Sequence, residues 1–355
     1  MERAPLSLEF GPGFVAGRVD SATEQLAFLP GHELDVCVAA ADLGARRVLG
    51  RLPGNHLHAG AIAGSRVRKK IYVAAVASIW AFPIEGGEPE LVVRLPELPA
   101  ASKAEMHEAF GVNEHNEHWV PRIKGQPSCY WAFELDEAED RLFALCGQDG
   151  ALDHLLEIDL GSGVVSSQTR LPGFCGGIEL DVSRKKIVLP RLKGGPCVLD
   201  FAGHPLARWR EPTSWDAAFR PSDGAVVLAN EADDLWLWDW ERNASTRVAE
   251  DASAPTCASD GTVFFMRTSA ELWMVEPAAS PQLIVRALEN EGGTEFDRKH
   301  AWVKRPRLSR DGRFLLVQLT SIRKTGRAHD AVVVDRIDRR VHQFPGFFSY
   351  VTSWF

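Results

Sequence analysis

The sequence predicts an all-β fold, a single seven-bladed β-propeller in which every blade is a four-stranded antiparallel sheet. Two sequence patterns that each occur seven times, and the near absence of helical periodicity, predict this fold. The first pattern is a tight polar turn followed by an apolar run that is typical of a strand. Its copies lie at residues 21–29, 66–74, 136–145, 181–189, 221–228, 259–266 and 309–317. Three of the turns contain Asp-Gly, a dipeptide that readily supplies positive φ between antiparallel strands.

The second pattern is an apolar run that ends in an acidic residue or proline and leads into a polar turn. Its copies lie at residues 36–42, 79–83, 155–159, 197–200, 235–239, 272–276 and 331–335. Their last residues are separated by 41, 76, 41, 39, 37 and 59 positions, so the repeat is about forty residues long and two junctions are longer. A short closing strand follows the second pattern and reads Arg-Leu-Pro three times, at Arg51, Arg94 and Arg170.

Seven units of this length, with four strands each, are typical of a β-propeller. We therefore expect one domain over residues 1–355, with loop insertions before blade 3 (about 98–126) and before blade 7 (289–305). The first insertion contains the one stretch that looks helical, residues 100–110. Residues 347–355 form a further apolar stretch of strand length, which would extend blade 1 or blade 7 or lie beneath the ring.

The third strands contain tryptophans, as in Leu235-Trp236-Leu237-Trp238-Asp239-Trp240 and Leu272-Trp273-Met274. In this respect the repeats resemble the WD40-like bacterial propellers of the TolB, YncE and prolyl-oligopeptidase type. The resemblance covers nearly the whole chain, but it implies the fold alone and no specific family. Because Trp80, Trp236, Trp238 and Trp273 lie in the middle of apolar runs, we expect them to pack between blades.

Composition excludes several classes of partner. Forty Lys and Arg against 48 Asp and Glu give a net charge of −8 without a long basic run, so we expect no nucleic-acid binding. No apolar stretch approaches the ~18 residues of a membrane span, and the start of the chain has no signal-peptide pattern, so we expect no membrane partner and a cytoplasmic location. The six cysteines form no CxxC pair, which favours buried, reduced thiols.

In a propeller the first strand of each blade lines the centre, and the loops between blades open on one face, here called the top face. Binding sites are common on such loops because a rigid scaffold holds them. We therefore expect the protein to bind a peptide, a protein or a small polar ligand on the top face and in the central channel. The candidate ligand-binding residues are aromatic or cationic side chains of the insertions, first-strand starts and the blade 7 loop: Trp119, Tyr130, Trp131, Trp215, Trp302, Lys304, Arg305 and Arg323.

An alternative function follows from the histidines, because eight of the eleven fall in loops that are expected on the top face, His329 and His32 among them. Imidazoles from several loops suit a divalent ion such as zinc, manganese or iron. The candidate metal ligands are His56, His58, His115, His118 and His300. Glu117 would then move protons in a lyase, hydrolase or oxygenase reaction. The competing interpretation is that these are ordinary solvated loops, so the sequence leaves open whether the protein is an enzyme.

Overall fold

The computed structural model describes most of the chain. The described residues are 5–19, 24–30, 34–41, 46–53, 61–105, 126–172, 178–190, 195–209, 214–230, 232–288, 305–323, 326–345 and 349–354. For strand residues 130–132, 214, 215, 323, 326, 327, 350 and 351 the description concerns the backbone alone.

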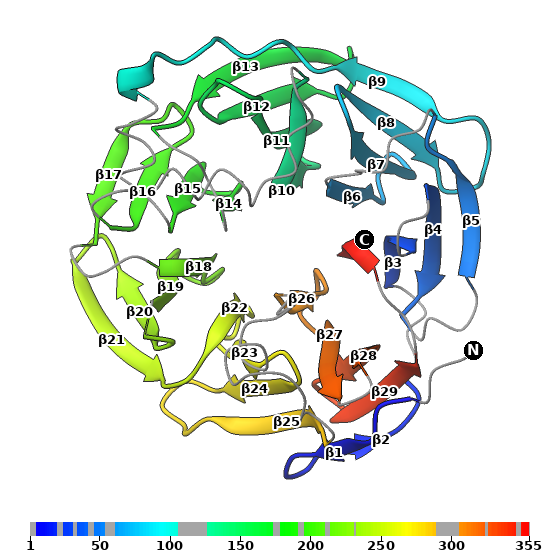
Figure 1. The fold of residues 1–355 in the computed structure, drawn as a ribbon, viewed down its shortest axis with the longest axis vertical. Helices are drawn as coiled ribbons and strands as arrows, with labels where there is room; N and C mark the ends of the chain where they lie inside the picture. Colours follow the sequence, from blue (N-terminus) through cyan, green and yellow to red (C-terminus); the bar gives the residue numbers. More distant parts are fainter. Residues whose placement is uncertain are drawn as a thin grey trace.

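Seven antiparallel sheets stand around a common centre, as Figure 1 shows, so the chain is a seven-bladed β-propeller, as predicted. Blades 1 to 7 each have an innermost strand, in the order β30 (Ser349–Trp354), β6 (Ala61–Ser65), β10 (Ser128–Asp136), β14 (Glu179–Asp181), β18 (Ser214–Phe219), β22 (Ser253–Cys257) and β26 (Arg307–Leu308). The second strands are β3 (Gln25–Pro30), β7 (Lys70–Ala75), β11 (Arg141–Gly147), β15 (Lys186–Leu189), β19 (Val226–Asn230), β23 (Val263–Thr268) and β27 (Phe314–Arg323).

The two outer positions of each blade complete the sheets. The third strands are β4 (Asp35–Ala40), β8 (Ser78–Pro83), β12 (His154–Asp159), β16 (Cys197–Asp200), β20 (Leu235–Asp239), β24 (Glu271–Val275) and β28 (Gly326–Asp335). The fourth strands are β5 (Arg46–Arg51), β9 (Glu90–Arg94), β13 (Val164–Arg170), β17 (Pro205–Arg208), β21 (Ala244–Ala249), β25 (Gln282–Ala287) and β29 (Arg340–Pro345). The two repeated patterns of the sequence therefore mark the second and third strands of every blade.

Both ends of the chain join sheets that are built mainly from other parts of the sequence. The C-terminal strand β30 pairs antiparallel with β3, so the last strand of the chain is the innermost strand of blade 1. At the other end, β1 (Leu8–Phe10) adds a fifth strand to blade 6, and β2 (Val15–Ala16) adds a parallel fifth strand to blade 7. Of the three places that the sequence left open for residues 347–355, the structure selects blade 1. This pairing closes the ring.

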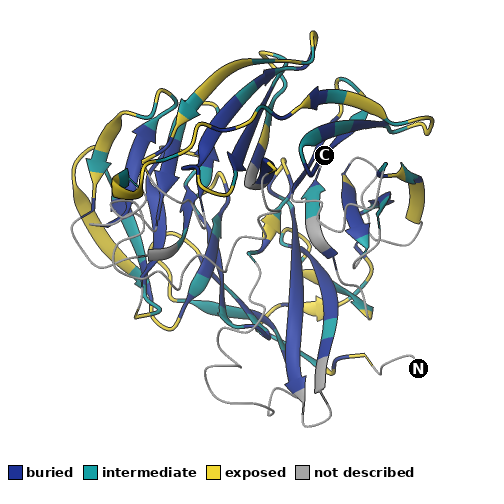
Figure 2. Cartoon of the chain, turned by 45° about the horizontal axis from the view of Figure 1, so that its top comes forward, coloured by how far each residue is buried: buried dark blue, intermediate teal, exposed yellow. Residues whose placement is uncertain are grey.

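The core consists of seven separate apolar clusters, each lying between two neighbouring blades. In β3, for example, Leu26 and Phe28 face the cluster shared with blade 7, whereas Ala27 and Leu29 face the cluster shared with blade 2. Because both faces of a blade are buried, its central strands are continuously apolar instead of alternating. In Figure 2 the buried residues accordingly gather in the inner and middle strands, and the exposed residues on the outer ones.

The tryptophans of the third strands follow the predicted pattern. Trp238 is buried and stacks on Trp209, with ring centroids 6.0 Å apart, in the cluster between blades 4 and 5. Trp80, Trp236 and Trp273 are partly buried and pack against inter-blade clusters. The tryptophans therefore contribute to packing between blades, as expected.

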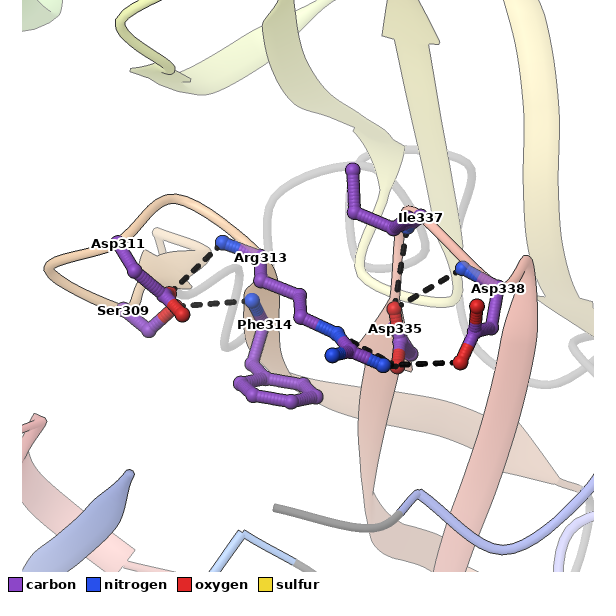
Figure 3. A network of polar contacts seen from close by, with 7 residues as sticks. All are labelled: Ser309, Asp311, Arg313, Phe314, Asp335, Ile337 and Asp338. Atoms are coloured by element: carbon purple, nitrogen blue, oxygen red, sulfur yellow. Dashed lines mark hydrogen bonds and ion pairs between the residues drawn. The ribbon is translucent and has the colours of Figure 1, made fainter. Parts of the chain in front are cut away.

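The recurrent polar turn is best seen in blade 7 (Figure 3). Ser309 donates its hydroxyl to Asp311 at 2.6 Å, and the same carboxylate oxygen accepts the backbone N–H of Arg313 at 2.9 Å. The Ser309 hydroxyl also accepts the N–H of Phe314 at 2.8 Å. Gly312 has φ of 73°, a conformation that glycine adopts without steric cost. The Ser-x-Asp-Gly sequence thus satisfies the backbone donors where the first strand turns into the second.

The acidic residue that ends the second pattern has a related role. Asp335 is buried, and one of its carboxylate oxygens accepts the N–H groups of Ile337 and Asp338 at 3.1 Å each. Its other oxygen accepts two hydrogen bonds from the guanidinium of Arg313, at 3.0 and 2.6 Å (Figure 3). Asp159, Asp200 and Asp239 likewise accept N–H groups of the turns that follow them. The acidic position recurs because it organises the turn into the fourth strand.

Two expectations are corrected by the structure. Cys129 of β10 and Cys146 of β11 lie opposite each other with Cα atoms 4.3 Å apart and form a disulfide, so the prediction of reduced thiols is wrong for this pair. Among the described residues, Cys37, Cys197 and Cys257 form no disulfide and are buried, as predicted. His329 was expected in a loop, but it is part of β28, because β27 and β28 continue to the tip of a long hairpin. The hydroxyl oxygen of Thr320 lies 3.0 Å from its Nδ1 atom.

Part of the first insertion is described. Ser102 accepts the N–H of Glu105 at 3.2 Å, and Glu105 accepts the N–H of Ser102 at 2.7 Å, which is a capping box at the start of a helix. Helical geometry begins at Lys103, three residues later than predicted, and residues 106–110 of the predicted helix lie outside the described residues.

Candidate functional site in the centre of the ring

The structure places only some of the predicted ligand-binding residues. Tyr130 and Trp131 lie on β10 and Trp215 lies on β18, both innermost strands, as expected; their side chains lie outside the description. Arg323 ends β27 at the tip of the blade 7 hairpin, and its side chain is not described either. Trp119, Trp302 and Lys304 lie outside the described residues, so their part in binding stays a prediction.

The predicted metal ligands also lie outside the described residues. These are His56, His58, His115, His118 and His300, together with the predicted proton-transfer residue Glu117. Within the part of the chain that the structure describes, no three His, Cys, Asp or Glu side chains are grouped so that they could hold a metal ion. No helix in that part is long and apolar enough to cross a membrane.

Arg305 is the one predicted ligand-binding residue whose side chain is described, and it contacts the inner strands of three other blades. It precedes β26 of blade 7, and its guanidinium donates to the carbonyl of Pro255 in blade 6 at 2.7 Å and to that of Ala217 in blade 5 at 2.5 Å. It also forms an ion pair with Glu179 of blade 4. Burial lowers the pKa of Arg305, but Glu179 and Asp216 outweigh burial, so its net pKa shift is upward. Arg305 therefore joins four blades through one cation.

Arg307 follows two residues later and has a different environment. Its side chain is exposed, although β26 is an innermost strand, so water reaches it inside the ring. Burial lowers the pKa of Arg307 and the neighbouring charge of Arg305 lowers it further, whereas Glu179 and Glu134 oppose this shift. Among the described residues, its guanidinium takes part in no ion pair or hydrogen bond. The backbone carbonyl of Arg307 is held by the indole N–H of Trp354 at 2.8 Å.

Glu134 supplies a negative charge to the same region from blade 3. It lies on β10 between Phe133, which is buried in the cluster between blades 2 and 3, and Leu135. The side chain of Glu134 is exposed, and it has no ion pair or hydrogen bond within the described part of the chain. Burial inside the ring raises the pKa of Glu134 to about 7, helped by the charge of Glu179, while the nearby arginines Arg307, Arg305 and Arg310 oppose this rise. The pKa of this carboxyl group therefore lies well above the ordinary range of a glutamate.

A second arginine bridge lies where the first strands turn into the second strands. Arg310, in the turn after β26, pairs with Glu137, in the turn after β10, and so connects blade 7 with blade 3. Glu137 also accepts the N–H of Val67 of blade 2 at 3.5 Å. Burial opposes ionisation of Glu137, but Arg310 and the hydrogen bonds lower its pKa overall. The charges of Arg310 and Glu137 therefore neutralise each other, as do those of Arg305 and Glu179.

The centre of the ring thus combines two satisfied ion pairs with two charged groups that have no protein partner among the described residues. The unsatisfied groups are Arg307 and Glu134, and both were missed in the sequence. A usable signal was present, because a charged residue inside an otherwise apolar first strand can avoid the inter-blade core only by facing the centre. The pair Arg305 and Arg307 gave the same signal, since residues two apart on a strand share a face.

The sequence matches no protein-family model and no curated protein. Solved structures with a similar fold include TolB from Acinetobacter baumannii, with 9% identity and a TM-score of 0.46 over 94% of this chain and 66% of that chain. PorZ, a surface component of the type-IX secretion system of Porphyromonas gingivalis, has 12% identity and a TM-score of 0.49 over 82% of this chain and 33% of its own. A protein of unknown function from Bacteroides caccae has 12% identity and a TM-score of 0.48, over 93% and 98%.

This chain therefore spans less than two thirds of the TolB and PorZ chains. The predicted resemblance to bacterial propellers is one of fold, which the seven sheets of the chain itself establish, and no specific family is indicated.

Proposed function

We propose that this propeller binds a small polar ligand in the centre of its ring, with Arg307 as the main anchoring group. The observation that carries the proposal is the exposed guanidinium of Arg307 on an innermost strand, without an ion-pair partner among the described residues. Water reaches this guanidinium, and the neighbouring positive charge of Arg305 disfavours its charged form. A ligand anion would offset this repulsion and accept two parallel N–H···O bonds from Arg307.

The surroundings of Arg307 support ligand binding instead of a structural role. Arg305 shows what a structural arginine looks like at this level of the ring, since its guanidinium contacts three other blades. The ion pairs of Arg305 and Arg310 hold their partners in place and leave Arg307 accessible. The aromatic residues Trp131 and Trp215, which were predicted to bind ligand, belong to innermost strands of the same ring.

The proposal is tested by thermal-shift titration of the purified protein with acetate, inorganic phosphate, glycine and diglycine. We expect at least one of these four probes, each of which carries a carboxylate or phosphate group, to raise the melting temperature in a saturable way, and we expect the shift to disappear in the variant Arg307→Met. Arg242→Met is the matched control, because Arg242 is exposed on the outer rim of blade 5 and loses the same charge. If Arg307→Met responds like the wild-type protein, or if no probe binds, the proposal is wrong.

The metal-dependent enzyme predicted as an alternative depends on histidines outside the described residues and stays a prediction, as do the cytoplasmic location and a peptide or protein partner on the top face. Elemental analysis of the purified protein and of the double variant His56→Ala, His58→Ala tests the metal prediction. Stoichiometric metal that is lost in the variant would favour the enzyme.

A further inference from the structure

The Cys129–Cys146 disulfide lies near one end of the innermost strand of blade 3, next to the first insertion. Cys129 is the second residue of β10, which begins just after this insertion, and Cys146 is the last residue but one of β11 (Figure 1). Only the pair of Ser128 and Gly147 lies beyond the disulfide in this ladder. On the other side of the disulfide the ladder is irregular, because residues 130–132 of β10 stand opposite a single residue of β11. This end of β10 is therefore separated from the regular part of the blade.

The start of the first insertion is held by the loop that follows β11. Leu98 donates its N–H to the side-chain oxygen of Gln148 at 2.7 Å. Ala101 donates its N–H to the carbonyl of Gly150 at 2.8 Å. This loop begins two residues after Cys146. The start of the insertion is therefore attached to a stretch of chain that follows closely on this cysteine.

The end of the insertion is held to blade 2 and, through the disulfide, to β11. The carbonyl of Pro127 accepts the N–H of Ala77, in the turn between β7 and β8, at 2.9 Å. Two residues after Pro127, Cys129 is bonded to Cys146. The disulfide is therefore a covalent link between the residues that end the insertion and the strand whose loop holds its start.

The surroundings of the disulfide suit its reduced form as well as its oxidised form. Cys129 and Cys146 are buried in the apolar cluster between blades 2 and 3, which also contains Leu98. A thiol packs in such a cluster as a small apolar group, so reduction leaves no strong hydrogen-bonding group unsatisfied. Because the disulfide is one pair from the end of the ladder, local separation of Ser128 from Gly147 should expose it without unfolding of the blade.

We infer that this disulfide is a reversible, redox-sensitive link at the base of the first insertion, residues 98–101 and 127–129. Its reductant is a small thiol such as glutathione. The glutathione thiolate attacks one sulfur and forms a mixed disulfide, while the Cys129–Cys146 bond breaks and the other cysteine leaves as a thiolate that takes up a proton. A second glutathione thiolate attacks the glutathione sulfur of the mixed disulfide, which releases the first cysteine and forms glutathione disulfide. Oxidation by glutathione disulfide reverses both steps.

Reduction should loosen the base of the insertion and leave the ring closed. Without the disulfide, the start of β10 is held to β11 only by two residue pairs beside the irregularity. Residues 133–136 remain in four consecutive pairs with β11, and β30 still closes the ring on β3. The part of β10 that loosens leads directly into Tyr130 and Trp131, which were predicted to bind ligand. The redox state therefore acts on one innermost strand and on the segment that precedes it.

Hydrogen–deuterium exchange of the full chain, followed by mass spectrometry, tests this inference in glutathione buffers that run from fully oxidised to fully reduced. Alkylation of free thiols in the same samples gives the fraction of Cys129 and Cys146 in the disulfide. We expect the disulfide to open and to reform as the buffer is changed and changed back. Reduction should speed the exchange of peptides that contain the amides of Leu98, Ala101 and Ala77 by roughly tenfold or more, and leave blades 4 to 6 unchanged.

The double variant Cys129→Ala, Cys146→Ala is the matched control for the reductant. Its exchange at the base of the insertion should be fast in both oxidised and reduced glutathione. Cys197→Ala removes a buried thiol that forms no disulfide, so this variant should respond to glutathione like the wild-type protein. If the double variant does not fold, the comparison of the two redox states of the wild-type protein decides alone.

Three results would overturn the inference. If glutathione leaves the disulfide intact until urea unfolds the protein, the disulfide is a permanent structural one. If both thiols stay reduced in oxidised glutathione, the disulfide does not form in the folded protein. If the disulfide opens but exchange at the base of the insertion is unchanged, or rises equally in every blade, the disulfide does not control the order of this segment.

Discussion

Replacing Glu134 by glutamine should make the protein more stable at pH 8 and leave its stability nearly unchanged at pH 4.5. The ring raises the pKa of Glu134 from 4.5 to about 7, so the folded protein binds more protons than the unfolded chain between these values. The contribution of Glu134 to stability is therefore most favourable below pH 4.5, and it declines as the pH rises to 7. A rise in pKa from 4.5 to about 7 would correspond to ~3.4 kcal/mol for a group that water does not reach. Because the side chain of Glu134 is exposed, we expect about 1 kcal/mol.

The measurement is urea unfolding of the wild-type protein and of Glu134→Gln at pH 4.5, 6, 7 and 8, followed by tryptophan fluorescence. The difference in unfolding free energy between the two proteins should grow from about zero at pH 4.5 to about 1 kcal/mol at pH 8, with the variant the more stable. Glu88→Gln removes the same charge from an exposed turn and should show no such growth. A constant difference between wild type and Glu134→Gln at all four pH values would refute the reasoning.

Two further predictions concern the fold. Trp354 is buried against Phe314, and its indole N–H donates to the carbonyl of Arg307. Trp354→Ala should therefore lower the unfolding free energy by ~3–5 kcal/mol, whereas Trp354→Phe should lower it by about 1 kcal/mol. Equal losses for the two variants in denaturant titrations would contradict this prediction. Burial lowers the pKa of His154, while its Nδ1 atom lies 2.9 Å from the carbonyl of Leu152, so the neutral ring contributes stability that is complete above pH 6.5 and is lost as the pH falls. His154→Asn should flatten the stability profile below pH 6.5 by up to ~1.4 kcal/mol per pH unit, and an unchanged slope would exclude this role.

The repeated architecture could be predicted from the sequence because each blade uses the same local chemistry. The Asp-Gly turns at Gly224, Gly261 and Gly312 all have positive φ, and the acidic residues that end the third strands accept the N–H groups of the next turn. These interactions are local, so they leave a pattern in the sequence. Ring closure is different, because β30 pairs with β3 across almost the whole chain. Nothing local distinguishes a strand that opens blade 1 from one that extends blade 7.

The disulfide also depends on strand pairing that local sequence patterns do not reveal. Cys129 and Cys146 are 17 residues apart and become opposite only through the register of β10 on β11. That register contains an irregularity between Cys129 and Phe133, so counting residues from the hairpin turn does not give the pairing. A spacing rule that searches for CxxC pairs cannot detect a cross-strand disulfide of this kind.

The predicted ligand-binding and metal-binding residues stay predictions, and Arg307 and Glu134 were not among them. The first strands were expected to supply aromatic side chains, and the insertions were expected to supply cations and histidines. The charges that the structure brings together come instead from the inner strands, where Glu134, Glu179 and Arg307 interrupt apolar or short segments. Whether such a charge is paired depends on contacts between blades that are distant in sequence. Arg305 and Arg307 are two residues apart, yet only Arg305 has a carboxylate partner within the described residues.

Blade 7 connects the closure of the ring with the chemistry at its centre. Its innermost strand β26 has only two residues, and the arginines on and around it extend toward blades 3, 4, 5 and 6. The carbonyl of Arg307 accepts the indole N–H of Trp354, which belongs to the strand that closes blade 1. The last strand of the chain therefore helps to hold the backbone of Arg307. A strand this short has few ladder hydrogen bonds of its own, so the bond from Trp354 adds to the pairing of Arg307 with Leu316 of β27 in holding this backbone.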